Sequence, residues 1–535
     1  MTTKDLARML SETADLMEVL GESGFRVNAY RKAARALERY QGDLTELQTA
    51  GFASLPGIGK GLAAALAEIV ASGEFDYLEE LRGQVPPGVS ELFAVQGLGP
   101  KRIRALWRAG IDSLGELARA AEEGRVAAMP GFGKKSEQAL LEAARFALAN
   151  LRRVHLPLGL EAARLPLADL EAAGIRAELA GSLRRRLETA GNVDLVAQAA
   201  PEAVLAALGE YASEVRGGVV QGRLGRLPLR VFCAPARDFG TALLRATGSD
   251  GWVRALGELP AAADEAGVFA GLGRPPVPPA WREPEHLGLE PPARLVERRD
   301  LAGLVHLHTS YSDGSATLRT MAEAAIAAGY EYMVVSDHSQ TAAYAGGLTL
   351  EALERQWAEI DELNAELAPF VILKGIESDI LPGGELDYPG EVLARFDVVL
   401  GSLHAHFKLS YEEQTERLLR AVENPYLTIL AHPTGRLLLR RKGVEADWER
   451  VLARAAELGK IVEINANPWR LDLDWRLALE WRERLVFSIG PDAHDPEGYA
   501  DVVYGLWMAQ KAGLGPERVA NTWPAERWLA LREGG

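Results

Sequence analysis

The stretch LVHLHTSYSDG at residues 304–314 joins a strand-like apolar run to two histidines and an aspartate. His306 and His308 alternate along the run, and alternate strand residues point the same way. Amphipathic helical stretches, such as LEALERQWAEIDELNAEL from Leu350, separate most of the runs that follow. Strands alternating with helices predict a parallel sheet, here a barrel of about seven strands. The six later runs are YMVVSDH, VILKGIES, VVLGSLH, LTILAHP, KIVEINAN and LVFSIGPDAH.

Imidazoles and carboxylates gather where these predicted strands end, the edge of a parallel barrel where loops converge. A single histidine of this kind is more easily explained as a hydrogen-bonded core residue, but a group at successive strand ends favours a metal centre. Imidazole and carboxylate together suit zinc, manganese or iron, and nine ligands with one bridging are about right for three ions. The nine candidates are His306, His308, Asp313, His338, Glu377, His404, His432, Asp492 and His494, with Asp337 beside them.

Length and composition predict a multidomain globular protein of 535 residues, with 48% hydrophobic and 25% charged residues. No apolar run approaches a membrane span, no secretory signal is visible, and the single cysteine, Cys233, fits a reducing cytoplasm. The net charge of −16 is uneven: residues 300–535 hold 22 Lys+Arg against 37 Asp+Glu, whereas residues 100–155 hold 11 against 6. We therefore expect a cytoplasmic, nucleoid-associated protein with a basic N-terminal segment and no membrane partner.

A glycine-rich pattern occurs three times in the first 150 residues: Leu-Pro-Gly-Ile-Gly-Lys from 55, Val-Gln-Gly-Leu-Gly-Pro-Lys from 95 and Met-Pro-Gly-Phe-Gly-Lys from 129. The glycines permit a tight turn and leave backbone N–H groups uncovered at the start of the next helix, where phosphate is attracted. One copy is as easily a simple helix–helix turn, but three copies favour DNA binding, and they resemble the helix–hairpin–helix motif of DNA repair proteins. The predicted contacts are Gly57, Gly59, Lys60, Gly97, Gly99, Lys101, Arg102, Arg104, Gly131, Gly133 and Lys134.

The central segment GSLRRRLETAGNVD, residues 181–194, resembles the nucleotidyltransferase signature of family X DNA polymerases. Asn28-Ala29-Tyr30-Arg31, Phe239-Gly240 and Thr247-Gly248-Ser249 extend the resemblance over residues 1 to about 270. By that resemblance Ser182 and Arg185 hold the triphosphate of an incoming dNTP, and three carboxylates hold two Mg²⁺ or Mn²⁺ ions.

Two of those three carboxylates are replaced, because Asn192 and Pro228 stand at acid positions and Asp194 alone remains. We therefore expect a vestigial polymerase site with little templated synthesis, and Pro228 predicts an edge or distorted strand. Alanines stand where the family carries its Schiff-base lysine after the first hairpin, so lyase activity is not expected.

The C-terminal region resembles the PHP domain, named for polymerase and histidinol phosphatase. That resemblance assigns His306, His308, Glu377 and Asp492 to one metal. It assigns Glu377, His404 and His432 to a second, and Asp313, His338 and His494 to a third. Manganese or zinc is the implied metal, and His338, Glu377 and Asp492 are the implied catalytic residues. Arg436, in the stretch HPTGR, is a candidate phosphate ligand or a simple surface ion pair.

The whole chain is similar to bacterial family X DNA polymerase fused to a PHP domain. We expect a small helical domain with the first hairpin (1–90), fingers with two hairpins (91–153), an α+β palm (154–240) and a thumb-like segment (241–274). A proline-rich linker (275–299) then leads to a (β/α)7-like PHP barrel (300–535).

The resemblance implies a metal-dependent 3′–5′ DNA exonuclease acting on gapped DNA or 3′ ends, with protein partners left open. Two alternatives remain: a gap-filling polymerase with a proofreading PHP exonuclease, in which Glu188 or a backbone group compensates for the lost acids, and a non-catalytic DNA scaffold.

Overall fold

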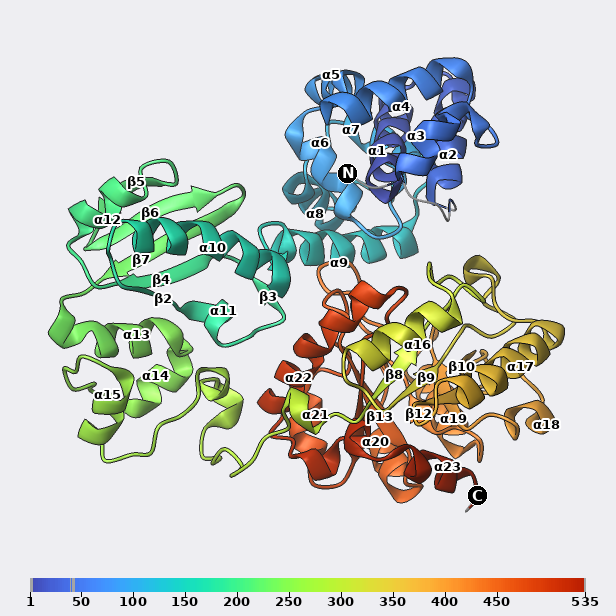
Figure 1. The fold of residues 1–535 in the computed structure, drawn as a ribbon. Coiled ribbons are helices and arrows are strands. Elements are labelled where there is room, and N and C mark those ends of the chain that lie inside the picture. The colour runs from blue at the N-terminus through green and yellow to red at the C-terminus, as the bar shows by residue number, and fades with distance from the viewer. Residues whose placement is uncertain (1–2, 39, 41–43, 534–535) are drawn as a thin grey trace. The chain divides into compact units, whose positions relative to one another are not determined.

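The computed structural model of the chain describes residues 3–38, 40 and 44–533. They form two compact units, Met1–Leu151 and Arg152–Gly535, which are coloured from blue to red along the chain in Figure 1. Among the described residues, no helix is both long and apolar enough to cross a membrane.

The first unit is helical and is built around one core of aliphatic side chains from successive short helices. Three of its helices begin directly after the glycine-rich turns: α4 (Lys60–Ser72), α7 (Pro100–Arg108) and α9 (Lys134–Asn150). The other elements are α1 (Thr3–Leu20), α2 (Gly24–Glu38), α3 (Leu44–Ala50), η1 (Phe52–Ser54), α5 (Asp76–Gln84), α6 (Pro87–Glu91), η2 (Leu92–Ala94) and α8 (Leu114–Glu122).

The second unit opens with a five-stranded sheet in the order β2-β4-β7-β6-β5, in which only the β4–β7 pair is parallel. A two-stranded pair, β1–β3, lies beside the signature segment. The elements are β1 (Val154–His155), α10 (Leu156–Ala172), β2 (Ala177–Leu179), α11 (Gly181–Arg184), β3 (Thr189–Ala190), β4 (Val193–Ala197), α12 (Pro201–Ala207), β5 (Ala212–Arg216), β6 (Val219–Leu224) and β7 (Leu227–Cys233).

Pro228 does not mark an edge strand, so that part of the prediction is wrong. β7 lies between β4 and β6, and Pro228 is its second residue. Pairing with β4 begins one residue later, at Val193↔Leu229, so no hydrogen bond to β4 is demanded of the proline. The start of a strand tolerates proline for this reason.

The segment between the sheet and the barrel is made of short helices joined by loops, and parts of it are buried. Within the proline-rich stretch, the Trp281 and Arg282 side chains are almost fully buried, and Trp281 Nε1 donates to the Gln510 carbonyl at 2.8 Å. The elements are η3 (Ala236–Asp238), α13 (Phe239–Thr247), α14 (Asp250–Leu256), α15 (Glu265–Gly271), η4 (Pro279–Trp281), η5 (Pro284–His286) and η6 (Arg298–Asp300).

Seven parallel strands form the C-terminal region in sequence order, as predicted. They are β8 (Gly303–Leu307), β9 (Tyr332–Val335), β10 (Val371–Asp379), β11 (Val398–Ser402), β12 (Ile429–Leu430), β13 (Ile461–Asn465) and β14 (Val486–Gly490). A parallel bridge from Leu307 to Ala493, with His308 N donating to Ala493 O at 2.8 Å, brings the ends of β8 and β14 together and nearly closes the barrel. The predicted fold class is confirmed.

Helices follow most of the strands and bury their apolar faces against the sheet. They are α16 (Leu318–Ala327), η7 (Ala343–Ala345), α17 (Leu350–Glu366), α18 (Gly390–Leu393), α19 (Tyr411–Glu423), α20 (Trp448–Glu457), α21 (Trp475–Trp481), η8 (Pro496–Asp501), α22 (Val502–Lys511), η9 (Pro516–Arg518), η10 (Ala520–Thr522) and α23 (Ala525–Glu533).

Candidate metal centre and nucleic-acid interface

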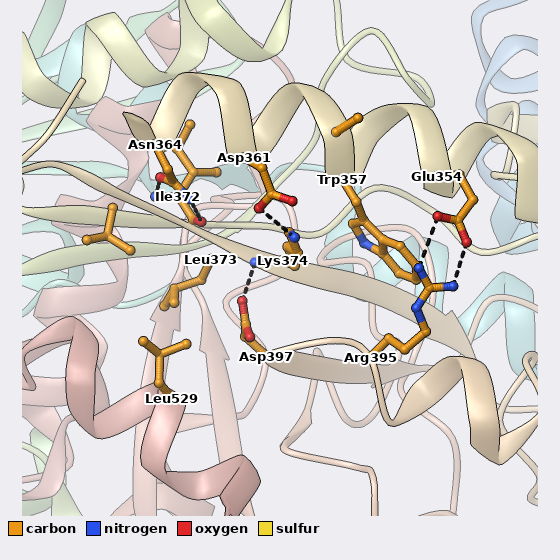
Figure 2. A pocket seen from close by; sticks show the side chains of 12 residues that line it. Glu354, Trp357, Asp361, Asn364, Ile372, Leu373, Lys374, Arg395, Asp397 and Leu529 are labelled. Carbon is orange, nitrogen blue, oxygen red and sulfur yellow. Dashed lines mark hydrogen bonds and ion pairs between the residues drawn. The ribbon is translucent and has the colours of Figure 1, made fainter. Parts of the chain in front are cut away.

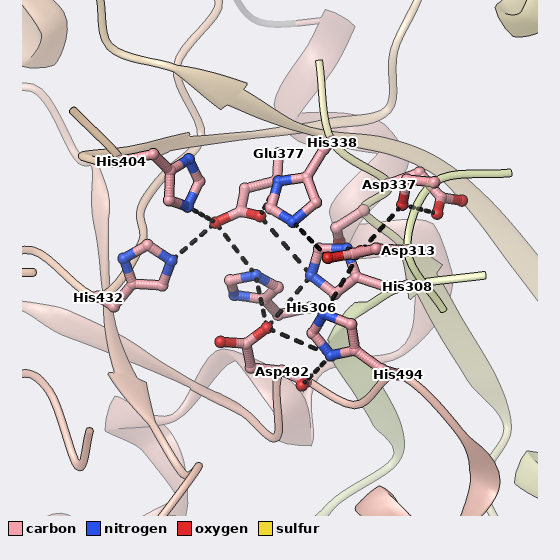
Figure 3. Close-up of polar contacts among 12 residues, drawn as sticks. His306, His308, Asp313, Asp337, His338, Glu377, His404, His432, Asp492 and His494 are labelled. Carbon is pink, nitrogen blue, oxygen red and sulfur yellow. Dashed lines mark hydrogen bonds and ion pairs between the residues drawn. The ribbon is translucent and has the colours of Figure 1, made fainter. Parts of the chain in front are cut away.

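All nine predicted metal ligands meet at the carboxyl ends of the barrel strands (Figure 3). His306 and Glu377 lie on β8 and β10, and the others follow β8, β9, β11, β12 and β14. Seven of them, with Tyr344, Leu437 and the stretch after β13, line a cavity of about 270 Å³. The loops bring together residues that are far apart in sequence, as expected for a parallel barrel.

Glu377 lies at the middle of the cluster, with five imidazoles around its two oxygens. Oε1 lies 2.7 Å from His432 Nε2, 3.2 Å from His404 Nε2 and 3.4 Å from His306 Nε2. Oε2 lies 2.9 Å from His338 Nδ1 and 3.6 Å from His308 Nε2. A carboxylate with each oxygen facing different imidazoles is suited to bridge two cations.

The two aspartates complete the cluster on its other sides. Asp492 Oδ1 lies 3.2 Å from His308 Nε2 and 3.7 Å from His306 Nε2. Asp313 faces three imidazoles, with His494 Nε2 at 3.4 Å, His338 Nε2 at 3.6 Å and His308 Nδ1 at 3.7 Å.

Four groups of side chains have ligand atoms close enough to share an ion. His308 joins the Asp313 group, and His404 and His432 reach Glu377 in separate groups, so the three-ion grouping implied by the family resemblance stays a prediction. The groups are His308, Asp313, His338 and His494; His306, Glu377 and His432; His306, His308 and Asp492; and His338, Glu377 and His404.

Several buried ligand atoms in this cluster make no hydrogen bond of suitable geometry to the described residues: His306 Nε2, both ring nitrogens of His308, His338 Nδ1 and Glu377 Oε2. His338 Nδ1 and Glu377 Oε2 lie 2.9 Å apart, but their contact does not have the angles of a hydrogen bond. Buried polar atoms are normally satisfied, so such a concentration calls for an ion or water. Six imidazoles and three carboxylates match the donors that Mn²⁺, Zn²⁺ and iron accept. The residues present therefore fit a metal centre.

Charge and backbone geometry support the same conclusion. Burial opposes ionisation of Glu377, yet His404 and His338 hold the pKa of its carboxyl well below the usual value. Burial, with His494 and His338, lowers the pKa of His308 to about 3, so its imidazole is neutral and able to ligate. His306, His432 and Asp492 have φ of 70°, 25° and 53°. Such strained backbone is concentrated at functional sites.

The strand alternation used to align His306 with His308 is not regular. The β8–β9 register shifts between Leu304 and Leu307, and His306 lies within this irregularity. A bulge re-aims side chains locally, and both imidazoles still reach the cluster, with ring centroids 5.3 Å apart.

Sequence analysis missed the carboxylates that orient the histidines. Glu463 on β13 is fully buried; its Oε1 lies 2.5 Å from His306 Nδ1, and its Oε2 accepts from His432 N at 2.6 Å. Asp379 Oδ1 lies 2.6 Å from His404 Nδ1. Glu463 lies inside the strand-like run KIVEINAN, and Asp379 comes at the end of the run VILKGIESD. A charged side chain in a buried strand must be paired. That signal was present in the sequence.

Asp337 does not face the ligands but supports the loop after β8. Its carboxylate accepts from Thr309 N at 2.8 Å, Ser312 Oγ at 2.5 Å and Gln356 Nε2 at 2.6 Å. These bonds fix the loop that carries Asp313.

The palm presents a different picture, because its remaining carboxylate is already paired. Arg230 grips Asp194 with two bonds, Nε to Oδ1 at 2.7 Å and Nη2 to Oδ2 at 2.8 Å. The buried Nδ2 of Asn192 has no hydrogen-bond partner in the part of the chain that the structure describes. The Asp194 carboxylate, the acid predicted to be vestigial, is thus neutralised by a bidentate ion pair.

The arginines of the signature segment also contact protein groups. Arg185, the predicted phosphate ligand, donates from Nε to Glu283 at 2.8 Å and from Nη1 to the Thr247 carbonyl at 2.6 Å. Arg184 pairs with Glu265 through two bonds. Ser182, the other predicted phosphate ligand, is half-buried in α11.

Glu188, the alternative acid, points to the barrel domain, 3.1 Å from Arg476 Nη1. Arg436 is not exposed: its guanidinium donates to Asp474 at 2.6 Å and to the Arg470 carbonyl at 2.9 Å. Its contacts are those of a buried structural pair.

The three hairpins of the first unit share one local geometry. Gly57, Gly97 and Gly131 have φ of 87°, 81° and 83°, and the residue after each donates its N–H to the carbonyl three positions before it. Gly59, Gly99 and Gly133 are the N-caps of α4, α7 and α9, and no side chain caps any of the three at its N2 or N3 N–H. Exposed N–H groups at such helix starts are suited to phosphate.

The basic residues of these motifs are unequally placed. Lys60, Lys101, Arg102 and Lys134 are exposed. Arg102 Nη2 donates to the Gly131 carbonyl at 3.4 Å, which joins the second and third hairpins. Arg104 is half-buried, and with Lys101 it lines a cavity of about 830 Å³ together with residues from α1, α2, α7 and the third hairpin.

A second cavity in the barrel domain, of about 570 Å³, lies beside the amino-terminal half of β10 (Figure 2). Its charged groups satisfy one another: Lys374 lies 2.6 Å from Asp361, Arg395 pairs with Glu354, and Asp397 accepts from the Lys374 N–H at 2.9 Å. It lies at the strand end away from the metal cluster.

Comparison with known proteins agrees with this architecture. Family models match at residues 1–75 (helix-hairpin-helix domain), 89–145 (SAM-like helix-hairpin-helix tandem) and 305–467 (PHP domain). The chain is 35% identical to the DNA polymerase/3′-5′ exonuclease PolX of Bacillus subtilis (strain 168), over 97% of both chains. It is 28% identical to a probable phosphatase of Thermoanaerobacter sp. (strain X514), over 41% of this chain and 89% of that protein. It is 32% identical to a probable phosphatase of Acetivibrio thermocellus, over 30% and 63%.

Proposed function

Because the chain belongs to the PolX family, the family X DNA polymerases with a C-terminal PHP domain, we propose that it processes DNA ends mainly as a metal-dependent 3′–5′ exonuclease. The hydrolytic site is the nine-residue cluster of the barrel. The polymerase palm contributes little or no templated synthesis.

The contrast between the two acidic sites carries this proposal. The barrel cluster offers unpartnered ligand atoms around Glu377, whereas Asp194 in the palm has both oxygens bound by Arg230. Two-metal nucleotidyl transfer needs anionic ligands, and Asn192 and Pro228 supply none.

Bound divalent ions supply a nucleophilic water of lowered pKa and neutralise the scissile phosphate. The chain's own residues hold the ligand atoms in place: Glu463 and Asp379 fix the rings of His306 and His404 through their Nδ1 atoms. Such outer carboxylates orient the imidazole and raise its basicity. Manganese is the proposed physiological ion, with zinc as the alternative.

DNA binding is proposed for the hairpins of the first unit, in support of which three helix starts present backbone N–H groups beside exposed lysines. Phosphate contacts of this kind bind without regard to sequence. DNA with a gap or a free 3′ end is the proposed substrate.

The second candidate is a gap-filling polymerase with a proofreading nuclease, which the name of the Bacillus subtilis relative, DNA polymerase/3′-5′ exonuclease PolX, favours. Glu188 is an unsuitable replacement acid because it pairs with Arg476. A polymerase would therefore have to work with Asp194 alone or with backbone ligands.

One experiment separates the two. A gapped duplex labelled at the 5′ end of the primer is incubated with Mn²⁺, with and without dNTPs, using the native chain and Glu377→Ala and Asp194→Ala variants. We expect shortening that Glu377→Ala removes and no extension. Extension by the native chain that Asp194→Ala abolishes would establish the polymerase instead.

A further inference from the structure

Two large aromatic side chains that line the opening of the metal cavity are exposed to solvent. Tyr344 is 70% exposed and Trp469 is 46% exposed, and both line the 270 Å³ cavity that contains the ligand cluster. We propose that Tyr344 and Trp469 form a stacking site for the terminal base of the DNA strand, and that Arg470 holds its phosphate at the metal centre. This inference rests on the proposed exonuclease function.

Trp469 is held in place rather than free to move. The backbone N–H of Trp469 donates to Asn467 Oδ1 at 3.0 Å, and its backbone carbonyl accepts from Leu438 N at 2.7 Å. The indole ring meets the His155 ring edgewise, with centroids 3.9 Å apart. A fixed aromatic surface that remains half exposed offers a base little entropic penalty for stacking.

Tyr344 lies in η7, in the loop after β9. Its ring centroid is 6.0 Å from that of His338 and 6.1 Å from that of His404, two of the candidate ligands. The tyrosine thus comes from a different loop from Trp469, which follows β13, and the two border the same opening.

Arg470 supplies the charge that a phosphodiester requires. Its Nε lies 3.3 Å from Asp492 Oδ2, while its Nη1 is buried with no hydrogen-bond partner among the described residues. The backbone of the arginine is itself fixed, because its carbonyl accepts from Arg436 Nε at 2.9 Å. A guanidinium with a free buried N–H, lining the cavity beside the ligands, is suited to a phosphate oxygen.

The size of the cavity decides how a nucleotide would sit. About 270 Å³ is below the usual range for a pocket that encloses a whole drug-sized ligand. A phosphate and sugar fit inside, and the base is left at the rim, where the two aromatic rings lie. Every base has a π face, so such a site selects an unpaired nucleotide without reading its sequence. A small phosphate ester without a base would gain nothing from it.

The test removes the base and the rings separately. Single-stranded oligonucleotides ending in a normal 3′ nucleotide or in a 3′ tetrahydrofuran abasic residue are cut with Mn²⁺ by the native chain, Trp469→Ala, Tyr344→Ala, and the control Trp469→Phe. We expect the native chain to favour the normal end roughly tenfold, as one stacked base suggests. Each alanine variant should lose most of that preference by slowing only the normal substrate, and the phenylalanine variant should retain it.

Binding gives a readout that does not depend on turnover. Calorimetry with dAMP and with 2-deoxyribose 5-phosphate should show a preference for dAMP that Trp469→Ala reduces, with metal content by mass spectrometry unchanged. Arg470→Gln should weaken both ligands, and Arg470→Lys should restore part of the binding.

The outcomes separate this inference from the function on which it rests. Equal cutting of both ends by the native chain, unaltered in the alanine variants, would overturn the stacking site and leave the exonuclease standing. No cutting of either end would overturn the exonuclease. In that case, dAMP binding of equal affinity in the native chain and in Trp469→Ala would overturn the stacking site as well.

Discussion

Replacing Glu463 with glutamine should weaken metal binding without changing the packing of the barrel. Glutamine has the same shape but lacks the charge that faces His306 Nδ1 at 2.5 Å. The fully buried position gives water no access to compensate. Loss of an outer carboxylate behind a ligating histidine typically costs roughly 10- to 100-fold in metal affinity, which corresponds to about 1.4–2.7 kcal/mol.

His306 belongs to two of the four candidate ligand groups, so the effect should be large enough to measure. Calorimetric titration of the metal-free protein with Mn²⁺ would report the affinity, and exonuclease rates at saturating Mn²⁺ should recover toward the native value. Asp474→Asn is the matched control, because Asp474 pairs with Arg436 and contacts no imidazole of the cluster. Native Mn²⁺ affinity in Glu463→Gln would refute the assigned role of His306.

Three further outcomes are expected. His338→Ala or Glu377→Ala should abolish hydrolysis with DNA affinity nearly intact, because in the proposed function the cluster stabilises the transition state whereas the hairpins bind DNA. Cutting at the native rate would show that the centre is misassigned. Charge reversal at Lys101 and Arg104 should weaken DNA binding for every sequence. The slope of the logarithm of the binding constant against the logarithm of salt concentration should become shallower by roughly one released counterion per lost phosphate contact. An unchanged slope would mean that DNA binds elsewhere on the protein. Burial opposes protonation of His338, but Glu377 and Asp313 raise the pKa of its imidazole to about 10, so Mn²⁺ must displace a proton to bind. Below that pH the Mn²⁺ affinity of the protein should rise roughly tenfold per pH unit for each displaced proton. Calorimetry in buffers of different ionisation enthalpy counts the released protons, and a count of zero contradicts the reasoning.

The barrel and the clustering of the nine candidate ligands could be predicted because the order of the strands and the positions of the polar residues along the chain agree. Apolar runs set the strands, and residues such as His404 and His432 follow the runs directly, so the rule for parallel barrels brings them together. The hairpins were predictable because the same Gly-x-Gly pattern occurs three times, and the first glycine of each copy, Gly57, Gly97 or Gly131, has a positive φ.

Contacts made by single side chains across the fold could not be predicted in this way. The pairing of Arg230 with Asp194 depends on the β4–β7 register, which places the two residues directly opposite. The rule for parallel barrels places the loop after β13 at the same rim, but nothing in the local sequence of Arg470 or Trp469 indicates that these two side chains line the metal cavity.

The palm's polar groups now have an explanation that does not require nucleotide transfer. Glu188 pairs with the half-exposed Arg476, His155 packs on Trp469, and Lys511 donates to the Arg185 carbonyl at 3.0 Å. These contacts join the palm to the barrel domain. Trp469 is held from the palm side at the mouth of the metal cavity. A palm that lacks two metal-binding carboxylates would therefore still support the proposed hydrolysis, because it contacts the loop against which the terminal nucleotide is proposed to stack.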